Sequence, residues 1–462
     1  MFFLWVRENT SYFIMRLIIM KNKSIKWVLF STIIYAQGYT LNDCISIAID
    51  GKRTVLSAEL GVVSASKGLR ASYSGLLPSL QFSTNIAQNK FPNRRSVDFN
   101  FESLTFDTTF TSSINNYSAG LSLNQMLYDG GRTINRVKQA KRNLSISKLN
   151  QRQIKTQVIQ KVIQAYYDLL KAQKLSTVAN KNLEMSNQQV DLVKKQFDIG
   201  LVKRTDLLKA QVAKGQAEVD AINKKINLEN SRRILFNDMG LQDFGQNITA
   251  IDQDWIMPKI PSSTDVLKLL KSQNPTILIS ENQISLSDLS YKLSKGLRLP
   301  LLNSTMNYSA NGATSNQLLN ALDDDWILGV NLSISVPIYT GNNLSMQQQQ
   351  AKLSIQRSEY SYITLLNDLR VQAEIIRETL NNYAEIIPLN QAIVNSAEED
   401  LKLVTERYSL GSATILEVLD AQVSLLRSNS NLINTVHDAR IQEANLKATL
   451  GTLDQDYNKK EE

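Results

Sequence analysis

The chain is an internal duplication, and this feature restricts its possible folds more than any other. When the sequence is shifted by 211 residues without a gap, residues 210–212 (Ala-Gln-Val) fall on 421–423, and Gly200 falls on Gly411. Chance does not readily produce a register that stays constant over so long a stretch. We therefore expect the fold to be built from two copies of one structural unit.

The duplication divides the chain into five segments. We expect a signal peptide in residues 1–38, a first structural repeat in 39–240, a linker in 241–262 and a second structural repeat in 263–451. Each repeat is predicted to contain a helix, two strands and a long helical hairpin. Residues 452–462 form a C-terminal tail with a charged end, which is expected to fray.

The N-terminal segment has the pattern of a secretory signal peptide. Lys21, Lys23 and Lys26 precede an apolar run at 27–36, and an Ala-x-Gly cleavage site ends at Gly38. Met20 stands where such peptides usually begin, which leaves open that residues 1–19 precede the true start codon. The alternative interpretation is a buried N-terminal helix.

Each copy contains helices too long for the core of a compact domain. Residues 132–199 lack glycine and proline, and one helix of that length would span roughly 100 Å. Gly200 interrupts the helical pattern, which resumes at 203–239. The second copy has the matching segments 342–410, Gly411 and 412–450. The pattern predicts long coiled-coil hairpins, with a bend at Pro388.

Two stretches of alternating apolar and small polar residues precede each long helix. They lie at 80–87 and 121–124 in the first copy, and at 305–309 and 332–338 in the second. This alternation is typical of β-strands, either in a sandwich or in a barrel with lipid outside and water inside. Four strands are too few to close a transmembrane barrel, so several chains would have to pool them.

The repeat register changes upstream of the long helices. Leu77-Pro78 matches Leu299-Pro300 at a shift of 222 rather than 211 residues. The difference of 11 residues predicts an insertion between Pro78 and Tyr128. We expect this insertion to form a loop.

Composition excludes several classes of function. Cys44 and His437 are the only cysteine and histidine, which excludes a disulfide framework, a zinc cluster and a histidine-paired nucleophile within one chain. We therefore expect no cofactor and no metal, and we assign His437 no role. Cys44 is expected to be an unmodified thiol, with a lipid anchor as the alternative. Half of the formal net charge of +8 lies in residues 1–38, so the mature chain lacks the charge of a nucleic-acid-binding protein.

These features resemble the TolC-like outer-membrane efflux proteins over residues 40–451. The resemblance rests on the duplicated unit, the two Leu-Pro strand entries and the turns at 197–201 and 407–411. The segment 417–421 (Glu-Val-Leu-Asp-Ala) is the strongest single match. The resemblance implies an α+β membrane protein in the outer membrane that extends into the periplasm. Three chains would form one 12-stranded transmembrane β-barrel, and their helical hairpins a periplasmic tunnel.

The resemblance also implies a function and a set of partners. The chain would be the passive outer-membrane channel-tunnel of a tripartite efflux or type I secretion system, and not an enzyme. Its partners would be two further copies of the chain, outer-membrane lipid, a periplasmic adaptor and an inner-membrane transporter of the RND or ABC type. The competing hypothesis is a periplasmic coiled-coil adaptor or scaffold protein, which also uses long hairpins.

Two groups of site residues follow from the resemblance. The hairpin tips, where the adaptor would dock, correspond to Gly200, Leu201, Gly411 and Ser412. The residues that would close the periplasmic entrance correspond to Thr205, Asp206, Tyr408, Glu417 and Asp420. Glu417 and Asp420 are three residues apart and share a helix face, where crowded carboxylates would attract cations.

Two further positions leave questions open. The family has a basic residue where this chain has Ala413, so Lys203 or Arg204 is a candidate to replace it. Trp326 precedes a predicted strand, and either anchoring at the membrane interface or simple packing would explain it.

Overall fold

The computed structural model describes residues 38–102, 104–241 and 248–458. The predicted signal peptide therefore lies outside the described residues, except for Gly38, and so do residues 459–462 of the tail. Among the described residues, no helix is both long enough and apolar enough to cross a membrane.

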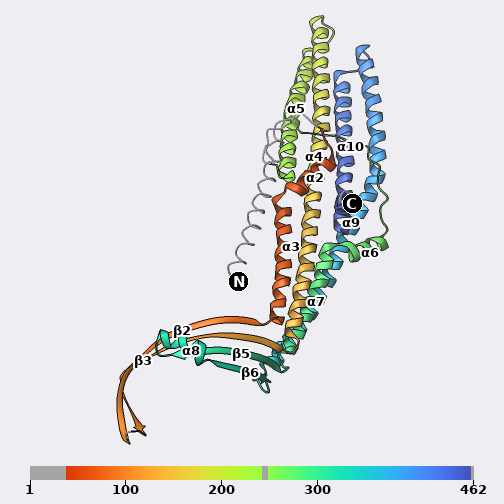
Figure 1. Ribbon diagram of the computed structural model, residues 1–462. Coiled ribbons are helices and arrows are strands. Elements are labelled where there is room, and N and C mark those ends of the chain that lie inside the picture. The colour runs from red at the N-terminus through yellow and green to blue at the C-terminus, as the bar shows by residue number, and fades with distance from the viewer. Residues whose placement is uncertain (1–37, 103, 242–247, 459–462) are drawn as a thin grey trace. The chain divides into compact units, whose positions relative to one another are not determined.

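The same order of elements occurs twice along the chain (Figure 1). The first copy contains α2 (Leu41–Gly51), α3 (Arg53–Ser72), β2 (Ser79–Asn100), β3 (Thr105–Tyr128), α4 (Arg132–Asp198) and α5 (Arg204–Met239). The second contains α6 (Ser263–Gln273), α7 (Pro275–Gly296), β5 (Leu301–Gly312), β6 (Ile327–Ser335), α9 (Asn343–Ser409) and α10 (Ile415–Leu450). Shorter elements are β1 (Gly38–Tyr39), the 3-10 helix η1 (Tyr73–Leu76), β4 (Thr249–Ala250), α8 (Ser315–Asp324) and α11 (Gln455–Asn458).

The long helices confirm the prediction from the missing glycines and prolines. α4 and α9 each contain 67 residues, and α5 and α10 each contain 36. α9 continues through Pro388, whose ring nitrogen cannot donate to the preceding turn. A bend at that residue stays a prediction.

The chain forms two compact units, and each copy of the repeat contributes to both. One unit comprises the described residues of Met1–Ser57, Ile154–Asn274 and Leu369–Glu462. The other comprises Ala58–Gln153 and Pro275–Asp368. The first is helical apart from the two-residue strands β1 and β4, and the second contains the four-stranded sheet.

The core of the helical unit joins distant parts of the chain. Cys44 in α2, Tyr166 in α4, Phe236 in α5 and Leu453 near the C-terminus are each no more than 2% exposed and belong to one cluster. The expectation that the tail frays is therefore wrong for its described part, because Leu453 completes this core. Burial raises the pKa of the Cys44 thiol to about 12, as expected for a packed, unreactive thiol.

The sheet has the order β2-β3-β5-β6, and all its pairs are antiparallel. The register places apolar residues of all four strands on one face, where Phe82 pairs with Leu121, Leu121 with Tyr308, and Tyr308 with Leu328. The opposite face carries small polar residues, including Ser83, Ser122, Asn307 and Ser333. The sheet thus has the two faces that the alternating pattern predicted.

The insertion in the first copy does not form a loop. β2 and β3 have 22 and 24 residues, against 12 and 9 in β5 and β6, and they run on past the ends of the shorter strands (Figure 1). The prediction of a loop was wrong because the added residues continue the ladder of β2 with β3, with one register shift between Lys90 and Arg94. Strand-forming threonines, phenylalanines and a valine in this stretch support that extension.

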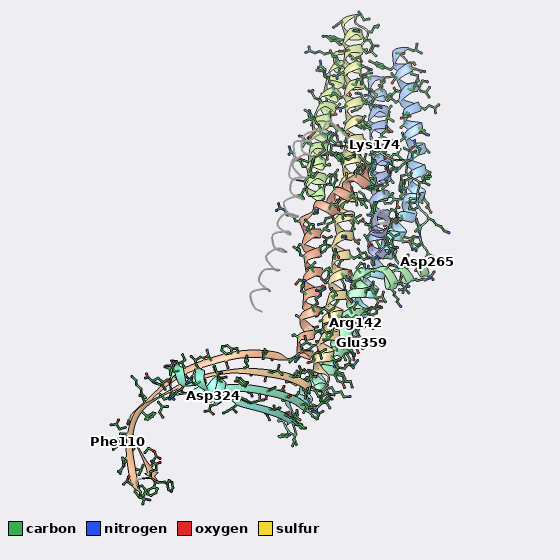
Figure 2. The ribbon with its side chains drawn as sticks, viewed as in Figure 1. Phe110, Arg142, Lys174, Asp265, Asp324 and Glu359 are labelled. Carbon is green, nitrogen blue, oxygen red and sulfur yellow. The ribbon has the colours of Figure 1, made fainter. Side chains whose placement is uncertain are left out.

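The second copy instead carries α8 between β5 and β6. Its N-cap Thr314 accepts from the backbone N–H of Gln317, a Thr-x-x-Gln signal that our sequence analysis missed. α8 packs on the apolar face of the sheet, where the Tyr308 hydroxyl donates to the Leu322 carbonyl at 2.6 Å. Figure 2 marks Asp324 at the end of this helix.

Candidate functional site

The candidate site lies at the turns that join the two helices of each hairpin. At both turns a glycine adopts the left-handed conformation, with φ of 78° at Gly200 and 74° at Gly411. The next residues, Leu201 and Ser412, donate their backbone N–H groups to Gln196 and Arg407 at 2.8 and 2.9 Å. These bonds form the Schellman motif that ends an α-helix, which explains why a glycine occupies the same position in both copies.

A buried apolar cluster holds the two hairpins together below these turns. It contains Val193 from α4, Ala210 from α5, Tyr408 from α9, and Ile415 and Val418 from α10. Each of these side chains is at most 6% exposed. The cluster therefore holds together the ends of four helices, two from each of two hairpins that are far apart in the sequence.

Tyr408 connects the apolar cluster to the polar residues of the tips. Its hydroxyl donates to Oε1 of Gln196 at 2.9 Å. Burial, together with the nearby Asp206 carboxylate, raises the pKa of the Tyr408 hydroxyl. Tyr408 is therefore a neutral donor at physiological pH, bonded across the two copies.

A cleft of about 770 Å³, which we call the tip cleft, opens between the two turns. Its lining includes five of the residues predicted from the resemblance, namely Leu201, Thr205, Asp206, Tyr408 and Gly411. Lys203 and Ala413 line the cleft as well. Lys203 therefore brings a positive charge into the cleft where the basic residue expected at position 413 is missing. Arg204 is not among the lining residues.

The structure places Glu417 and Asp420 in different surroundings. Glu417 closes a capping box, because its Oε1 accepts from the backbone N–H of Thr414 at 3.1 Å and from its hydroxyl at 3.0 Å. Asp420 lines a separate hollow of about 630 Å³ between α5 and α10, which we call the α5–α10 groove. Lys209, the residue that corresponds to Asp420 in the first copy, lines the same groove.

The capping bonds also define the charge state of Glu417. The Thr414 backbone N–H and hydroxyl hold the pKa of the Glu417 carboxyl below its usual value, and Arg407 adds to the effect from 3.8 Å. Arg407 also donates to the Ser412 carbonyl at 3.1 Å and so braces the turn. Glu417 is thus a carboxylate engaged in local structure, while Asp420 faces an open groove.

Three residues at the site, Gln196, Arg407 and Thr414, were not among the predicted site residues, although Arg407 belongs to the turn at 407–411. The spacing Thr414-x-x-Glu417 is a capping-box pattern that the sequence contains and that would have identified one of them. Gln196 carried no sequence signal, because its role depends on contact with a tyrosine of the other copy. In the part of the chain that the structure describes, no cluster of three or more His, Cys, Asp or Glu side chains could hold a metal ion.

Comparison with known proteins gives one consistent result. The family model described as "Outer membrane efflux protein" matches residues 44–240 and 266–452. The outer membrane efflux protein BepC of Brucella suis biovar 1 (strain 1330) is 23% identical over 423 residues, which cover 91% of this chain and 87% of that protein. The outer membrane protein TolC of Salmonella enteritidis is 26% identical over 355 residues, covering 74% and 70%.

A solved structure shows the same fold. The CmeC outer membrane channel of Campylobacter jejuni superposes with a TM-score of 0.77 at 18% sequence identity, covering 89% of this chain and 86% of that one. The resemblance found in the sequence is thereby confirmed, and with it the efflux-channel role and the outer-membrane location. The chain belongs to the outer membrane efflux protein family.

Proposed function

We propose that three copies of this chain form one passive exit duct, with their strands pooled in a single 12-stranded barrel. The observation that carries the proposal is the two-faced sheet of four strands. Its outer strands β2 and β6 each have one edge that pairs with no other strand among the described residues. Such edges require partners in lipid, where unpaired backbone groups cost several kcal/mol each.

The two faces supply the surfaces that this barrel needs. Apolar residues alternate along β2 from Leu80 to Ile86 and along β3 from Tyr117 to Leu123, and they form the kind of face that outer-membrane barrels turn to lipid. The small polar side chains of the other face would line a wet lumen. A duct of this kind needs no catalytic group, so we propose that the chain makes and breaks no bonds in its substrates.

Ion conductance of the purified protein in planar bilayers tests the proposal. We expect stable single channels that conduct small ions, because polar side chains line the lumen. The competing scaffold hypothesis predicts a folded helical protein with no conductance. Absence of channels from protein that is folded by circular dichroism would overturn the proposed duct.

We further propose that the tip cleft and the α5–α10 groove form the periplasmic gate of the duct. The cleft holds Thr205, Asp206 and Tyr408, and the groove adds Asp420. Opening would separate the two hairpins, and the bond between Tyr408 and Gln196 holds them together. Three copies would present three Asp420 carboxylates around one entrance, each with Lys209 lining the same groove, so loss of the Asp420 charge would shift the selectivity of the gate away from cations.

The different roles of Glu417 and Asp420 give this gate a matched pair of variants. We expect Asp420→Asn to lower cation selectivity and to weaken block by divalent cations from the periplasmic side. Glu417→Gln should change both properties much less, because glutamine also serves at the third position of a capping box. Equal effects of the two substitutions would contradict the assignment of Asp420 to the gate.

We also propose that the hairpin turns dock a periplasmic adaptor that connects the duct to an inner-membrane transporter of the RND or ABC type. Leu201 is 71% exposed beside Gly200, and Leu410 is 82% exposed beside Gly411 and Ser412. Exposed leucines at a turn favour burial against a partner. A photo-crosslinking residue at Leu201 should capture an adaptor in intact cells, whereas the same residue at exposed Lys225 in α5 should not. Capture of no periplasmic protein at Leu201 would overturn the docking proposal.

A further inference from the structure

The hairpin of β2 and β3 continues far beyond the rest of the sheet. Pairing of β3 with β5 ends at Tyr117, opposite Gly312. From there β3 pairs with β2 alone, as far as Thr105 opposite Asn100. We call the described residues of this stretch, 87–102 and 104–116, the ribbon. Its twelve positions beyond Tyr117 extend about 40 Å, and an isolated two-stranded hairpin of this kind is marginally stable in water.

The apolar side of the hairpin changes face along the ribbon. In the sheet, β3 carries its apolar residues at odd positions, such as Tyr117 and Leu121, and small polar residues at even positions. In the ribbon the apolar residues of β3 stand at even positions instead, at Phe106, Phe110 and Ile114. The register shift between Lys90 and Arg94 lies within the ribbon, where β2 advances four residues while β3 advances two. Both steps are even numbers, so each strand keeps its alternation across the shift, and the apolar side of the ribbon continues the face that is polar in the sheet.

The partner strand shows the same inversion. Register pairs Phe99 with Phe106 and Val97 with Thr108, so both β2 residues lie on the apolar side of the ribbon. The rings of Phe99 and Phe106 meet edge to face with centroids 5.1 Å apart. Arg95, opposite Phe110, is the charged residue on this side. Ser96 and Asp98 lie on the other side.

The apolar side of the ribbon is uncovered in one chain. Phe106 is 72% exposed and Phe110 is 68% exposed. Figure 2 marks Phe110 on the ribbon, beyond the part of β3 that pairs with β5. The sheet, by contrast, covers its apolar face at the same end, where α8 leaves Ala119 and Ala310 at most 7% exposed.

We propose that the ribbons of three chains meet at the axis of the duct and close its outer mouth with a ring of phenylalanines. This inference rests on the proposed trimer, in which the apolar face of the sheet contacts lipid and the polar face lines the lumen. The apolar side of the ribbon continues the lumen face, so it points to the axis rather than to lipid. In the trimer, the apolar side of each ribbon would contact the apolar sides of the ribbons of the two other copies. These copies are close by because the ribbon extends β2, the strand whose free edge would pair with a neighbouring chain.

Such a ring would act as an apolar constriction. Narrow apolar segments of a pore lose their water, which blocks ions until the segment widens. Movement of three marginally stable ribbons would open it. The proposed helical gate and this constriction would then be two separate points of closure.

Cysteine cross-linking tests the contact in the trimeric fraction of detergent-extracted protein. Native Cys44 is buried and is kept as an internal control. We expect Phe110→Cys to give at least about tenfold more covalent dimer under mild oxidation than Ser96→Cys, since a disulfide requires the two Cβ atoms to lie about 4 Å apart. Trimers that cross-link equally at both positions, or at neither, would overturn this inference and leave the proposed duct intact. Absence of trimers would overturn both.

Two further measurements separate closure of the mouth from the alternatives. The double variant Phe106→Ser with Phe110→Ser should raise single-channel conductance about twofold or more, whereas Ser96→Thr with Asp98→Asn should leave it unchanged. A fluorophore on Phe110→Cys should resist quenching by brominated lipids in vesicles. Strong quenching would show that the ribbon lies on the bilayer and would overturn the inference, as would unchanged conductance of the double serine variant.

Discussion

The two copies of the repeat agree in the lengths of their long helices and differ in their strands and in the first turns of α5 and α10. α4 and α5 have the same lengths as α9 and α10, and residues 200 and 411 end the long helices in the same motif. The strands before the helices and the first turns of α5 and α10 have diverged. The comparison indicates that the length of the helices and the motif that ends α4 and α9 were kept after the duplication, while the strands and the starts of α5 and α10 changed.

The bodies of α5 and α10 differ in burial even though their lengths match. His437 in α10 is 0% exposed, and its two ring nitrogens have no hydrogen-bond partner in the structure. The corresponding residue of α5 is Ile226, which is 52% exposed. Lys171, Lys174 and Arg440 around the imidazole add positive charge, and the Asp252 carboxylate opposes them.

Substitution of this buried histidine should change stability more than any other variant described below. Burial, and then Lys174 and Arg440, lower the pKa of His437 to about 4, while an unfolded chain binds the proton near pH 6.5. The contribution of neutral His437 to the free energy of unfolding is therefore fully present above pH 6.5. It falls by about 3 kcal/mol as the pH is lowered from there to about 4. Thermal unfolding of wild-type protein and of His437→Leu at several pH values measures the difference. The variant should lose less stability on acidification, and a parallel loss in both proteins would contradict the assignment.

The second prediction concerns the bond that joins the two copies at the tip. The first copy has Phe197 where the second has Tyr408. Tyr408→Phe removes the hydrogen bond to Gln196, so we expect a loss of about 1 kcal/mol and more frequent opening of the gate in bilayers. Gln196→Leu, which removes the other partner, is the matched variant. Channels that open as rarely as wild type in both variants would exclude a latch at Tyr408.

The smallest effects are expected at the first turns of α5 and α10. α10 begins with the Thr414–Glu417 capping box, whereas α5 begins at Lys203 with no side-chain cap. We expect Thr414→Ala to cost about 1 kcal/mol and Lys203→Thr to stabilise by several tenths, because Asp206 then stands at the third helical position. The Thr40–Asp43 box of α2 shows that aspartate completes such a cap in this protein. Chemical denaturation measures the change in the free energy of unfolding for both variants. Changes of the same sign would show that the caps do not distinguish the copies.

The sequence predicted the regular parts of the molecule because each had a local cause. The absence of glycine and proline predicts the long helices, and the two-residue alternation predicts the faces of the sheet. The ribbon was not foreseen, because its length depends on pairing between β2 and β3 rather than on either strand alone. The buried Leu453 was missed for the same reason, since its partners lie hundreds of residues away.

The candidate site was predictable in part. The resemblance located the turns, and the structure brings Thr205, Asp206 and Tyr408 to one cleft. The resemblance could not distinguish the roles of Glu417 and Asp420, because that distinction depends on which carboxylate accepts the hydrogen bond at the N-terminus of α10. Neither could it identify Gln196, whose only mark is its contact with Tyr408.

In the proposed trimer one chain supplies a third of a closed barrel. The decisive measurement is the mass of the protein in detergent micelles, determined by native mass spectrometry at concentrations from high to low. We predict a single species with three times the mass of the mature chain, which persists on dilution because β2 and β6 would otherwise present unpaired edges. A folded, monodisperse monomer would contradict the account.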